Sequence, residues 1–361
     1  MKNCLIVGGG LIGMLTAKEL VDSGVNVTII DKGAVAKESS WAGGGILSPL
    51  YPWRYDDAIT KLAQWSQHYY PGLCEQLRHE TTIDPEYTDS GLLMLEVDDK
   101  HMAHEWAKRF DHQMEDVLAT DLKLQEVELR SGHWSNCLCL PKVAQIRNPR
   151  LLGALRTWLA NKGVTFVEHT PVTSVWAENS KVFGVWLGRQ NLESESVIIA
   201  GGAWSSSLLS TVGLSVEIFP VQGQMVLFKA VPGLIKHIIM HEGFYIIPRC
   251  DGHVLAGSTV EYRGFDKQTT REAYEKLHAA AISLVPKLAD YPVVKHWAGL
   301  RPGSTKGIPY IGPVPDFQGL YVNSGHFRNG VVMGPASARL MVDMVLKRDT
   351  ILDARPYQFV N

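Results

Sequence analysis

The sequence has no hydrophobic run long enough to cross a membrane. A membrane-spanning helix needs roughly 18 or more consecutive apolar residues, and every apolar stretch here is shorter. The N-terminus does not look like a secretory signal, because Lys18, Glu19 and Asp22 interrupt its apolar segment. These absences predict a cytoplasmic protein without a membrane partner.

Cysteine is scarce and irregularly spaced. The five residues are Cys4, Cys74, Cys137, Cys139 and Cys250. An odd number without repeated spacing is not typical of a disulfide framework. Cys137 and Cys139 are too close for an unstrained disulfide, and they lack the usual two-residue gap of a metal or redox motif. We expect all five to be reduced packing residues and predict no metal site.

A surplus of positive charge is also missing. The chain has 35 Lys and Arg against 37 Asp and Glu, a net charge of -2. Without a basic surplus to neutralise phosphates, a nucleic acid or an anionic membrane is not an expected partner. The hydrophobic fraction of 45% and the charged fraction of 20% are those of an ordinary globular protein. A small molecule is therefore the expected ligand.

What the chain does have is a glycine fingerprint near its start. A short apolar strand at residues 4–7 leads into Gly8, Gly10 and Gly13, which form G-x-G-x-x-G ahead of a helical pattern. In this motif the glycines permit a tight turn, close approach of the backbone to a pyrophosphate, and helix–strand packing. The helix N-terminus then offers unpaired N–H groups to the phosphates. The pattern predicts a dinucleotide site.

Asp31 and two further glycine clusters narrow the choice of dinucleotide. Asp31 ends the second strand, at residues 25–30, where an acid accepts ribose hydroxyls and repels the extra phosphate of NADP. The small-residue run SSWAGGGILSP, residues 39–49, lets a loop lie flat beside a pyrophosphate and a flavin ring. A third run, AGGAW at residues 200–204, follows a strand and closes over the same nucleotide. Together they favour FAD over NAD.

The remaining pattern alternates helices with strand-rich blocks. Apolar periodicity predicts helices at residues 60–82, 101–114, 148–163, 269–284 and 337–347, and a strand-rich block at 216–260. This interleaving predicts a mixed α/β (α+β) fold, a Rossmann-like FAD-binding domain with an inserted, mainly antiparallel β-sheet substrate domain. The expected FAD-binding domain comprises residues 1–85, 146–215 and 299–361, and the substrate-binding domain residues 86–145 and 216–298.

One segment is predicted to be a loop that nevertheless holds a cation. WAGLRPGSTKGIPYIG, residues 297–312, is rich in Gly and Pro as surface loops are, yet it places Arg301 among apolar neighbours. A buried guanidinium needs a partner, and its fixed donors match a carboxylate in bidentate fashion. No acid lies close in this segment, so we interpret the partner as a ligand carboxylate. The alternatives are a distant structural acid or a side chain turned to solvent.

With these residues the sequence resembles the D-amino-acid oxidase family of FAD-dependent enzymes, in particular its glycine oxidases of the thiamine-biosynthesis type. The similarity covers essentially the whole chain. Its most specific pieces are SSWAGGGILSPLYPW, EHTPV, AGGAW, YIIPR, WAGLRPGSTKGIPYIG and GHFRNGVVMGPA.

The resemblance implies a set of contacts to non-covalently bound FAD. Backbone contacts are expected from Leu11 and Ile12, ribose recognition from Asp31 with Lys32, and an adenine contact from Val172. The resemblance further assigns phosphate, flavin and nucleotide contacts to Ser39, Ser40, Gly44, Gly45, Ile46, Gly201, His326, Phe327, Arg328, Asn329, Gly330, Val331 and Val332, beside Gly8, Gly10 and Gly13.

The resemblance also implies the substrate site and the reaction. Arg301 and Arg328 match the family's substrate-binding arginines, and Tyr245 matches its active-site tyrosine. Two positions depart from the family pattern, Gly243 in place of a His and Val260 in place of a Met, and both changes are expected at the pocket wall. The implied reaction is oxidation of glycine by oxygen and water to glyoxylate, ammonia and hydrogen peroxide, by hydride transfer to flavin N5. Sarcosine and small D-amino acids are expected secondary substrates, and the implied pathway role is to supply dehydroglycine for thiazole synthesis.

Other functions remain open at this level. A dehydrogenase of the same fold could pass electrons to a quinone, although no basic amphipathic membrane segment is evident. A D-amino-acid or sarcosine dehydrogenase or oxidase of the same fold, with a different acceptor or substrate, is a further alternative. A sarcosine-oxidase-like enzyme with covalent FAD is disfavoured, because that linkage normally needs a C-terminal cysteine and none follows Cys250. A non-catalytic FAD-binding or tRNA-modifying partner protein is a third possibility. The resemblance favours a homo-oligomer.

Overall fold

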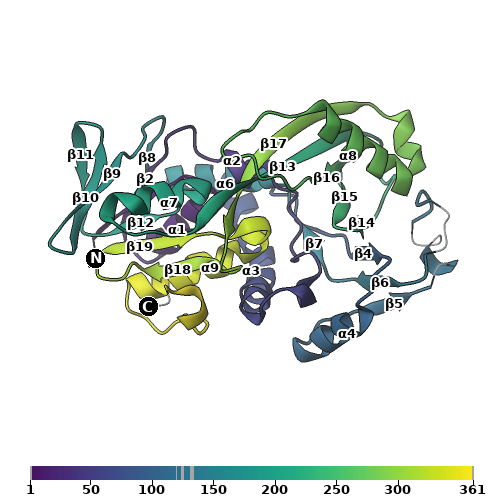
Figure 1. The fold of residues 1–361 in the computed structure, drawn as a ribbon, viewed down its shortest axis with the longest axis horizontal. Helices are drawn as coiled ribbons and strands as arrows, with labels where there is room; N and C mark the ends of the chain where they lie inside the picture. The colour runs from purple at the N-terminus through teal and green to yellow at the C-terminus, as the bar shows by residue number, and fades with distance from the viewer. Residues whose placement is uncertain (1, 119, 123–125, 131–133, 360–361) are drawn as a thin grey trace.

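Two large β-sheets organise the molecule and lie toward opposite ends of its long axis (Figure 1). The computed structural model describes residues 2–118, 120–122, 126–130 and 134–359. One sheet has six strands and the other has eight. The expected mixed α/β architecture, a Rossmann-like part joined to a mainly antiparallel part, is confirmed.

The six-stranded sheet is parallel except at one edge. Its strands in order are β18 (Tyr310–Pro313), β19 (Leu320–Ser324), β12 (Val197–Ile199), β1 (Asn3–Val7), β2 (Asn26–Ile30) and β8 (Thr165–Val167). Only β18 runs antiparallel to its neighbour. Central β1 pairs with both β2 and β12, and its last four residues are buried. A strand covered on both faces is apolar throughout, as residues 4–7 are.

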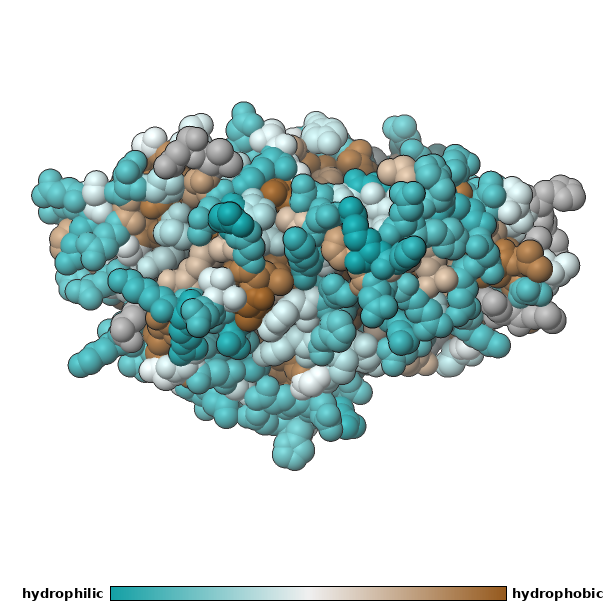
Figure 2. All heavy atoms as spheres, turned by 90° about the horizontal axis from the view of Figure 1, so that it is seen from below, coloured by the Kyte–Doolittle hydropathy of each residue, from teal (hydrophilic) through white to brown (hydrophobic). Residues whose placement is uncertain are grey.

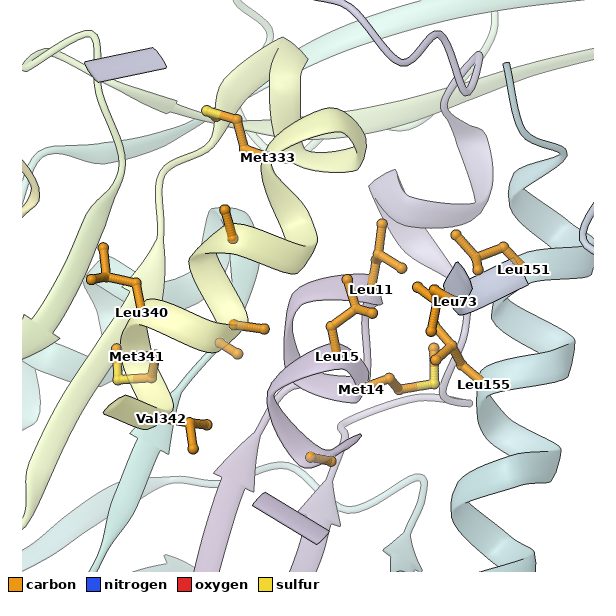
Figure 3. Packing of buried hydrophobic residues seen from close by; sticks show 14 of the residues in the cluster. Leu11, Met14, Leu15, Leu73, Leu151, Leu155, Met333, Leu340, Met341 and Val342 are labelled. Carbon is orange, nitrogen blue, oxygen red and sulfur yellow. The ribbon is translucent and has the colours of Figure 1, made fainter. Parts of the chain in front are cut away.

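Four helices pack together on one side of this sheet. They are α1 (Leu11–Asp22), α3 (Asp57–Thr81), α6 (Asn148–Asn161) and α9 (Gly330–Val345). Figure 3 shows their contact: Leu11, Met14 and Leu15 of α1 lie between the apolar side chains of α9 and those of α3 and α6. The helices expected at 60–82 and 148–163 are confirmed. This packing fixes the N-terminus of α1 against the edge of the sheet, where the glycine fingerprint lies.

Helix α9 begins at Gly330, well before the start expected near Ser337. It includes Pro335, which lacks an N–H and cannot bond the carbonyl of Val331. The hydroxyl of Tyr70 donates to that carbonyl at 2.6 Å, and Ser66 Oγ accepts from the next N–H, that of Ala336, at 3.0 Å. Two side chains one turn apart on α3 thus replace the bonding that the proline interrupts. This tertiary compensation is not visible in a local pattern.

The eight-stranded sheet is antiparallel except where β14 meets β4. Its strands in order are β17 (Val293–Ser304), β13 (Ile218–Lys229), β16 (His253–Gly257), β15 (Phe244–Pro248), β14 (Ile238–His241), β4 (Leu92–Leu95), β6 (Cys137–Leu140) and β5 (Glu115–Val117). Helix α8 (Arg271–Leu284) covers one face. Helix α4 (Lys100–Arg109) ends before the expected Met114, because Asp111 has φ 54°, outside the right-handed helical region.

Residues 297–304 form a strand, so their interpretation as a surface loop was wrong. They belong to β17, which pairs with β13 over its whole length, and Arg301 lies opposite Val221. The expected domain boundary between residues 298 and 299 falls inside this strand. Pro302 is tolerated because β17 is the edge strand and has a neighbour on one side only. Pairing with residues about eighty positions earlier overrides the local turn signal of Gly and Pro.

Smaller elements complete the chain. A three-stranded sheet joins β9 (Ser174–Glu178), β10 (Lys181–Leu187) and β11 (Gln190–Glu193), and a two-stranded one joins β3 (Thr88–Asp89) and β7 (Ala144–Gln145). The short helices are α2 (Glu38–Ala42), α7 (Ser205–Leu209) and the 3-10 turns η1 (Pro52–Arg54), η2 (Gly202–Trp204), η3 (Ser210–Val212), η4 (Pro286–Asp290), η5 (Phe327–Asn329) and η6 (Arg355–Tyr357).

The surface and the cysteines agree with the composition. Within the described ranges, no helix combines the length and the hydrophobicity needed to span a membrane. Figure 2 shows a face on which hydrophilic side chains predominate and hydrophobic ones form small separate groups. All five cysteines are free, and four of them are buried; Cys250 is exposed, so its expected role as a packing residue was wrong. Burial raises the pKa of the Cys4 thiol to about 12, so this side chain is an inert packing group.

Candidate active site

A cavity of about 330 Å³ lies between the two large sheets. At one end its wall consists of the carboxyl ends of the parallel strands, including Gly8 after β1, Asp31 after β2 and Ala200 after β12. At the other end it is lined by side chains of β13, β15 and β17. Ligands of open α/β sheets bind at this carboxyl edge. The cavity thus joins a nucleotide-binding edge to an antiparallel floor.

The nucleotide end owes its shape to glycine. Gly8 has φ +115°, and a Cβ there would lie 2.3 Å from the carbonyl oxygen of Ala200. A Cβ on Gly13 would lie 2.0 Å from the carbonyl oxygen of Gly8, so this glycine lets α1 approach β1. The N-cap of α1, Gly10, has no side chain to bond the first N–H groups. The N–H of Leu11 donates to Ser40 Oγ at 2.9 Å, which brings the Ser39–Ser40 segment to the helix end. This is an anion-binding arrangement.

Asp31 is held beside this helix end. One carboxylate oxygen accepts from the N–H of Gly9 at 2.7 Å and the other from Gly33 at 2.9 Å. Burial raises the pKa of Asp31, and these two bonds act in the opposite direction. Each oxygen keeps a free lone pair, so the carboxylate can still accept from hydroxyl donors. Next to it, Lys32 Nζ lies 3.2 Å from the ring centre of Trp204, which forms the neighbouring part of the wall.

The central wall is a flat run of small residues. A Cβ on Gly44 would lie 2.8 Å from Ile247 Cδ1 and 3.2 Å from Tyr245 Cε2, so strand β15 leaves no room for a side chain. Gly45 has φ +80°, and a Cβ there would lie 2.0 Å from the carbonyl oxygen of Ile146. At position 45 only glycine avoids displacing the backbone, and at position 44 a side chain would displace Ile247 and Tyr245. The result is a smooth surface of backbone along which a planar ring can lie.

Arg301 lies at the far end of the cavity and has no acidic partner among the described residues. Its Nη2 donates to Ser258 Oγ at 2.7 Å, and its Nη1 donates to the carbonyl of Thr259 at 3.1 Å. Burial lowers the pKa of Arg301, and the charge of Arg328 lowers it further. An arginine nevertheless stays protonated in the ordinary pH range. The cavity thus contains an uncompensated positive charge.

Tyr245 and Arg328 lie in the same part of the cavity. Tyr245 is buried, and its hydroxyl contacts Met225 Sδ at 4.0 Å and interacts with Arg301, which raises the pKa of the guanidinium. Arg328 Nη2 donates to the carbonyl of Gly243 at 3.4 Å, a long bond. Both side chains therefore keep hydrogen-bond donors that can bind a ligand. Three groups able to donate to an anion therefore converge at one end.

His326 is buried on the opposite side, next to α9. Its Nε2 shares a hydrogen bond with Ser337 Oγ at 3.0 Å. Burial lowers the pKa of His326 to about 3, so the ring is neutral near pH 7. It braces the turn η5 and the start of α9 and cannot supply a charge. His241, by contrast, makes an edge contact with Trp134 at 5.4 Å, which agrees with a structural role.

The structure brings most of the sequence-predicted residues together. Those that line the cavity are Gly8, Gly10, Leu11, Ile12, Asp31, Lys32, Ser39, Ser40, Gly44, Gly45, Ile46, Val172, Gly201, Tyr245, Arg301, His326, Phe327, Arg328, Gly330 and Val331. Gly13, Asn329 and Val332 lie behind the wall instead. Val260 was expected at the pocket wall and is not there, because its side chain is 42% exposed on the segment that follows β16. Gly243 was also expected at the pocket wall and does not line the cavity, although its carbonyl accepts a hydrogen bond from Arg328, which does.

Sequence reasoning missed three contributors to the Arg301 end. Gly223 lies on β13, opposite Gly299 of β17. It leaves space for the Arg301 guanidinium, since a Cβ on Gly223 would lie 2.2 Å from the two Nη atoms. Met225 lines the same wall, and Ser258 orients Arg301. A glycine inside an otherwise apolar strand often marks a close approach, so Gly223 was the available signal. Ser258 gives none, because its contact depends on folding.

The donor set and the shape fit FAD. An anion site at a helix N-terminus, a carboxylate beside it and a glycine-lined flat wall follow one another along a single cavity. Side chains at positions 8, 44 and 45 would collide with Ala200, Ile247 and Ile146, so only backbone forms this part of the wall. The acid at position 31 would repel a 2′-phosphate. The residues present therefore fit a dinucleotide whose far end carries a planar ring.

Comparison with known proteins gives the same result. The chain is 45% identical to a glycine oxidase of Pseudomonas aeruginosa over 357 residues, which is 99% of this chain and 98% of that protein. It is 28% identical to the bifunctional protein ThiO/ThiG of Trichormus variabilis, matching 96% of this chain but 53% of that longer protein. The crystal structure of glycine oxidase from Geobacillus kaustophilus superposes with a TM-score of 0.95 at 28% identity, covering 100% of this chain and 99% of that one.

A family model agrees over nearly the whole length. The model described as FAD dependent oxidoreductase, DAO, matches residues 3–344. This range contains both large sheets and every residue that lines the cavity. The chain belongs to the DAO family of FAD-dependent oxidoreductases.

Proposed function

We propose that this protein is a glycine oxidase that converts glycine, oxygen and water to glyoxylate, ammonia and hydrogen peroxide. The observation that carries the proposal is the uncompensated guanidinium of Arg301 at the end of a cavity that fits FAD. The 45% identity to a protein named glycine oxidase, over the full length of both chains, supports this substrate.

Arg301 binds the substrate carboxylate in this proposal. Ser258 and Thr259 hold two of its nitrogens in place, so the guanidinium is oriented before any ligand arrives. Preorganisation of this kind reduces the entropy lost on binding. The hydroxyl of Tyr245 donates to the same carboxylate, and Arg328 adds a second positive charge. The carboxylate thereby replaces the protein acid that Arg301 lacks.

When bound, FAD would supply the acceptor for the hydride of the substrate Cα and the route of its electrons to oxygen. The protein's part is to hold the zwitterion by one end and to exclude water from the other. Among the described residues, the groups that converge on Arg301 are Tyr245, Met225 and Arg328, and none of them is a carboxylate or a neutral histidine. No side chain there is suited to act as a general base. The amine therefore loses its proton to water before the reaction.

The side chains that line the Arg301 end of the cavity favour small substrates. Tyr245 and Met225 fill the space around the guanidinium, so a hydrogen or a methyl group at the Cα or nitrogen is accommodated more easily than a large side chain. Sarcosine and D-alanine are the expected secondary substrates. The bifunctional ThiO/ThiG relatives support a role in supplying dehydroglycine for thiazole synthesis. A cytoplasmic homo-oligomer is also part of the proposal, and light scattering of the holoprotein tests the assembly.

An oxygen-electrode assay of the purified yellow protein tests the function. We expect oxygen uptake with glycine, equimolar hydrogen peroxide and glyoxylate, and bleaching of the bound flavin by glycine under nitrogen. Bleaching under nitrogen without peroxide under air, restored by a quinone, would establish a dehydrogenase instead. A flavin that stays oxidised with glycine, sarcosine, D-alanine and D-proline would refute an amino-acid oxidase.

A further inference from the structure

A second buried arginine, outside the substrate end, also lacks a carboxylate of its own. Arg249 follows strand β15 and is 8% exposed. None of the ion pairs in the described part of the chain includes it, because the nearby Glu86 and Asp251 pair with Arg147. Burial lowers the pKa of Arg249 to about 10, which leaves it charged near pH 7. A buried cation without an acid must be held by other acceptors.

Those acceptors belong to the flat wall of the cavity and to the segment behind it. Arg249 Nη2 donates to the carbonyl of Gly44 at 2.7 Å. Its Nη1 donates to Gln145 Oε1 at 2.7 Å and to the carbonyl of Ile146 at 3.1 Å. Gln145 is itself fixed by a bond from its Nε2 to Ser90 Oγ at 2.6 Å. The planar fork therefore ties the wall to the sheet from behind.

The neighbouring backbone shows what this tie controls. Residues 45–47 pair with residues 144–146 through the N–H of Ile146 to the carbonyl of Gly45, at 2.9 Å, and the N–H of Leu47 to Ala144, at 2.9 Å. The carbonyl of Gly44 lies beyond this short ladder, and Arg249 is its partner. Gly44 and Gly45 have the least hindered backbones of any residues. Without the guanidinium, nothing in the described contacts fixes the orientation of the peptide between them.

That peptide carries a free donor. In a trans peptide the C=O and the N–H point in opposite directions. Because Arg249 holds the carbonyl of Gly44, the N–H of Gly45 points away from Arg249, and no described residue accepts from it. Both glycines line the cavity. Tyr245 on β15 lines the cavity, and Arg249, directly after β15, lies behind the wall. Between them, Ile247 lies against Gly44.

We propose that Arg249 is a positioning residue that orients the Gly44–Gly45 peptide so that its N–H is available to the ring of bound FAD. The inference rests on the proposed function, because it concerns the same site. The affinity for FAD and the flavin spectrum test it without glycine. Loss of the fork leaves two carbonyls unsatisfied and frees the peptide to rotate. Loss of a hydrogen bond to a charged group weakens the associated equilibrium about tenfold or more.

The test compares Arg249→Met and Arg249→Lys with the parent, and Arg147→Met is the matched control. Arg147 is a nearby arginine, but it bonds Glu86 and Asp251 and does not touch the wall. For each protein, FAD is removed and titrated back into the apoprotein. We expect the Kd for FAD to rise about tenfold or more in Arg249→Met, with an altered visible spectrum of the bound flavin. Arg249→Lys keeps the charge but not the fork, so its spectrum also changes, while the control matches the parent.

The kinetics with glycine distinguish a positioning role of Arg249 from a general loss of structure. With FAD saturating, we expect Arg249→Met to slow anaerobic reduction by glycine at saturating substrate while KM for glycine stays within about twofold, because Arg301 binds the carboxylate elsewhere. If Arg249→Met does not fold, the Kd for FAD and the flavin spectrum of Arg249→Lys test the proposal on their own. Parent-like Kd and flavin spectrum in Arg249→Lys would overturn the inference. A protein inactive with glycine but showing these FAD effects would refute the proposed function and leave the role of Arg249 intact.

Discussion

Replacing Arg301 should damage glycine binding far more than it damages the cofactor site. In Arg301→Met the side chain keeps much of its volume but loses the charge and both donors to a carboxylate. A charge-assisted bidentate pair with a buried partner is worth about 2 to 4 kcal/mol. This corresponds to a rise in KM for glycine of roughly 30- to 1000-fold. Arg301→Lys keeps the charge without the fork and should lie between Met and the parent.

Steady-state oxygen uptake gives KM, and the visible spectrum reports whether the flavin site is intact. Arg301 also holds Ser258 and Thr259, so thermal unfolding of each variant must be recorded as well. Arg271→Met provides a control for loss of charge alone, since Arg271 is exposed on α8 and pairs with Glu275. A KM within about twofold of the parent in Arg301→Met, with bound and unaltered flavin, would refute the carboxylate clamp.

Three further predictions follow from neighbouring contacts. Gly223→Ala should raise KM for glycine without removing any charge, because the added methyl group would lie 2.2 Å from the Arg301 guanidinium unless that group moves; an unchanged KM would show that the strand yields instead. Tyr70→Phe should lower the free energy of unfolding of the apoprotein by about 1 to 2 kcal/mol in urea titrations, since it leaves the Val331 carbonyl beside Pro335 unsatisfied. His326, with its pKa lowered from 6.5 to about 3, should make the apoprotein less stable as pH falls below 6.5, by about 1.4 kcal/mol per pH unit, because only the unfolded chain takes up the proton there; a His326→Asn variant that lost stability just as steeply would contradict this.

The nucleotide half of the site was readable in the sequence because its chemistry is local. Gly8, Gly10 and Asp31 lie within one βαβ unit, and their spacing already contains the turn, the helix end and the acid. The mixed α/β fold followed from the same periodicities. FAD was distinguished from NAD by glycine runs that the structure places along one cavity.

The substrate half was harder because its parts meet only in the folded chain. Arg301 drew attention as an isolated cation, but Pro302 and the surrounding glycines suggested a loop where β17 pairs with β13. Ser258, which orients Arg301, and Gly223, which makes room for it, have no local pattern that signals these roles. The start of α9 was misplaced for a similar reason, since Tyr70 compensates for Pro335 from another helix. Long-range pairing decided each of these points.

The most direct measurement is a crystal structure of the FAD-loaded protein with a small carboxylic acid, such as glycolate, that competes with glycine. We predict that the acid binds at the far end of the cavity, with its two oxygens within hydrogen-bond distance of Arg301 and its Cα facing the flavin ring. A competitive acid bound away from Arg301, with that guanidinium still bonded only to protein groups such as Ser258, Thr259 and Gln222, would contradict this prediction.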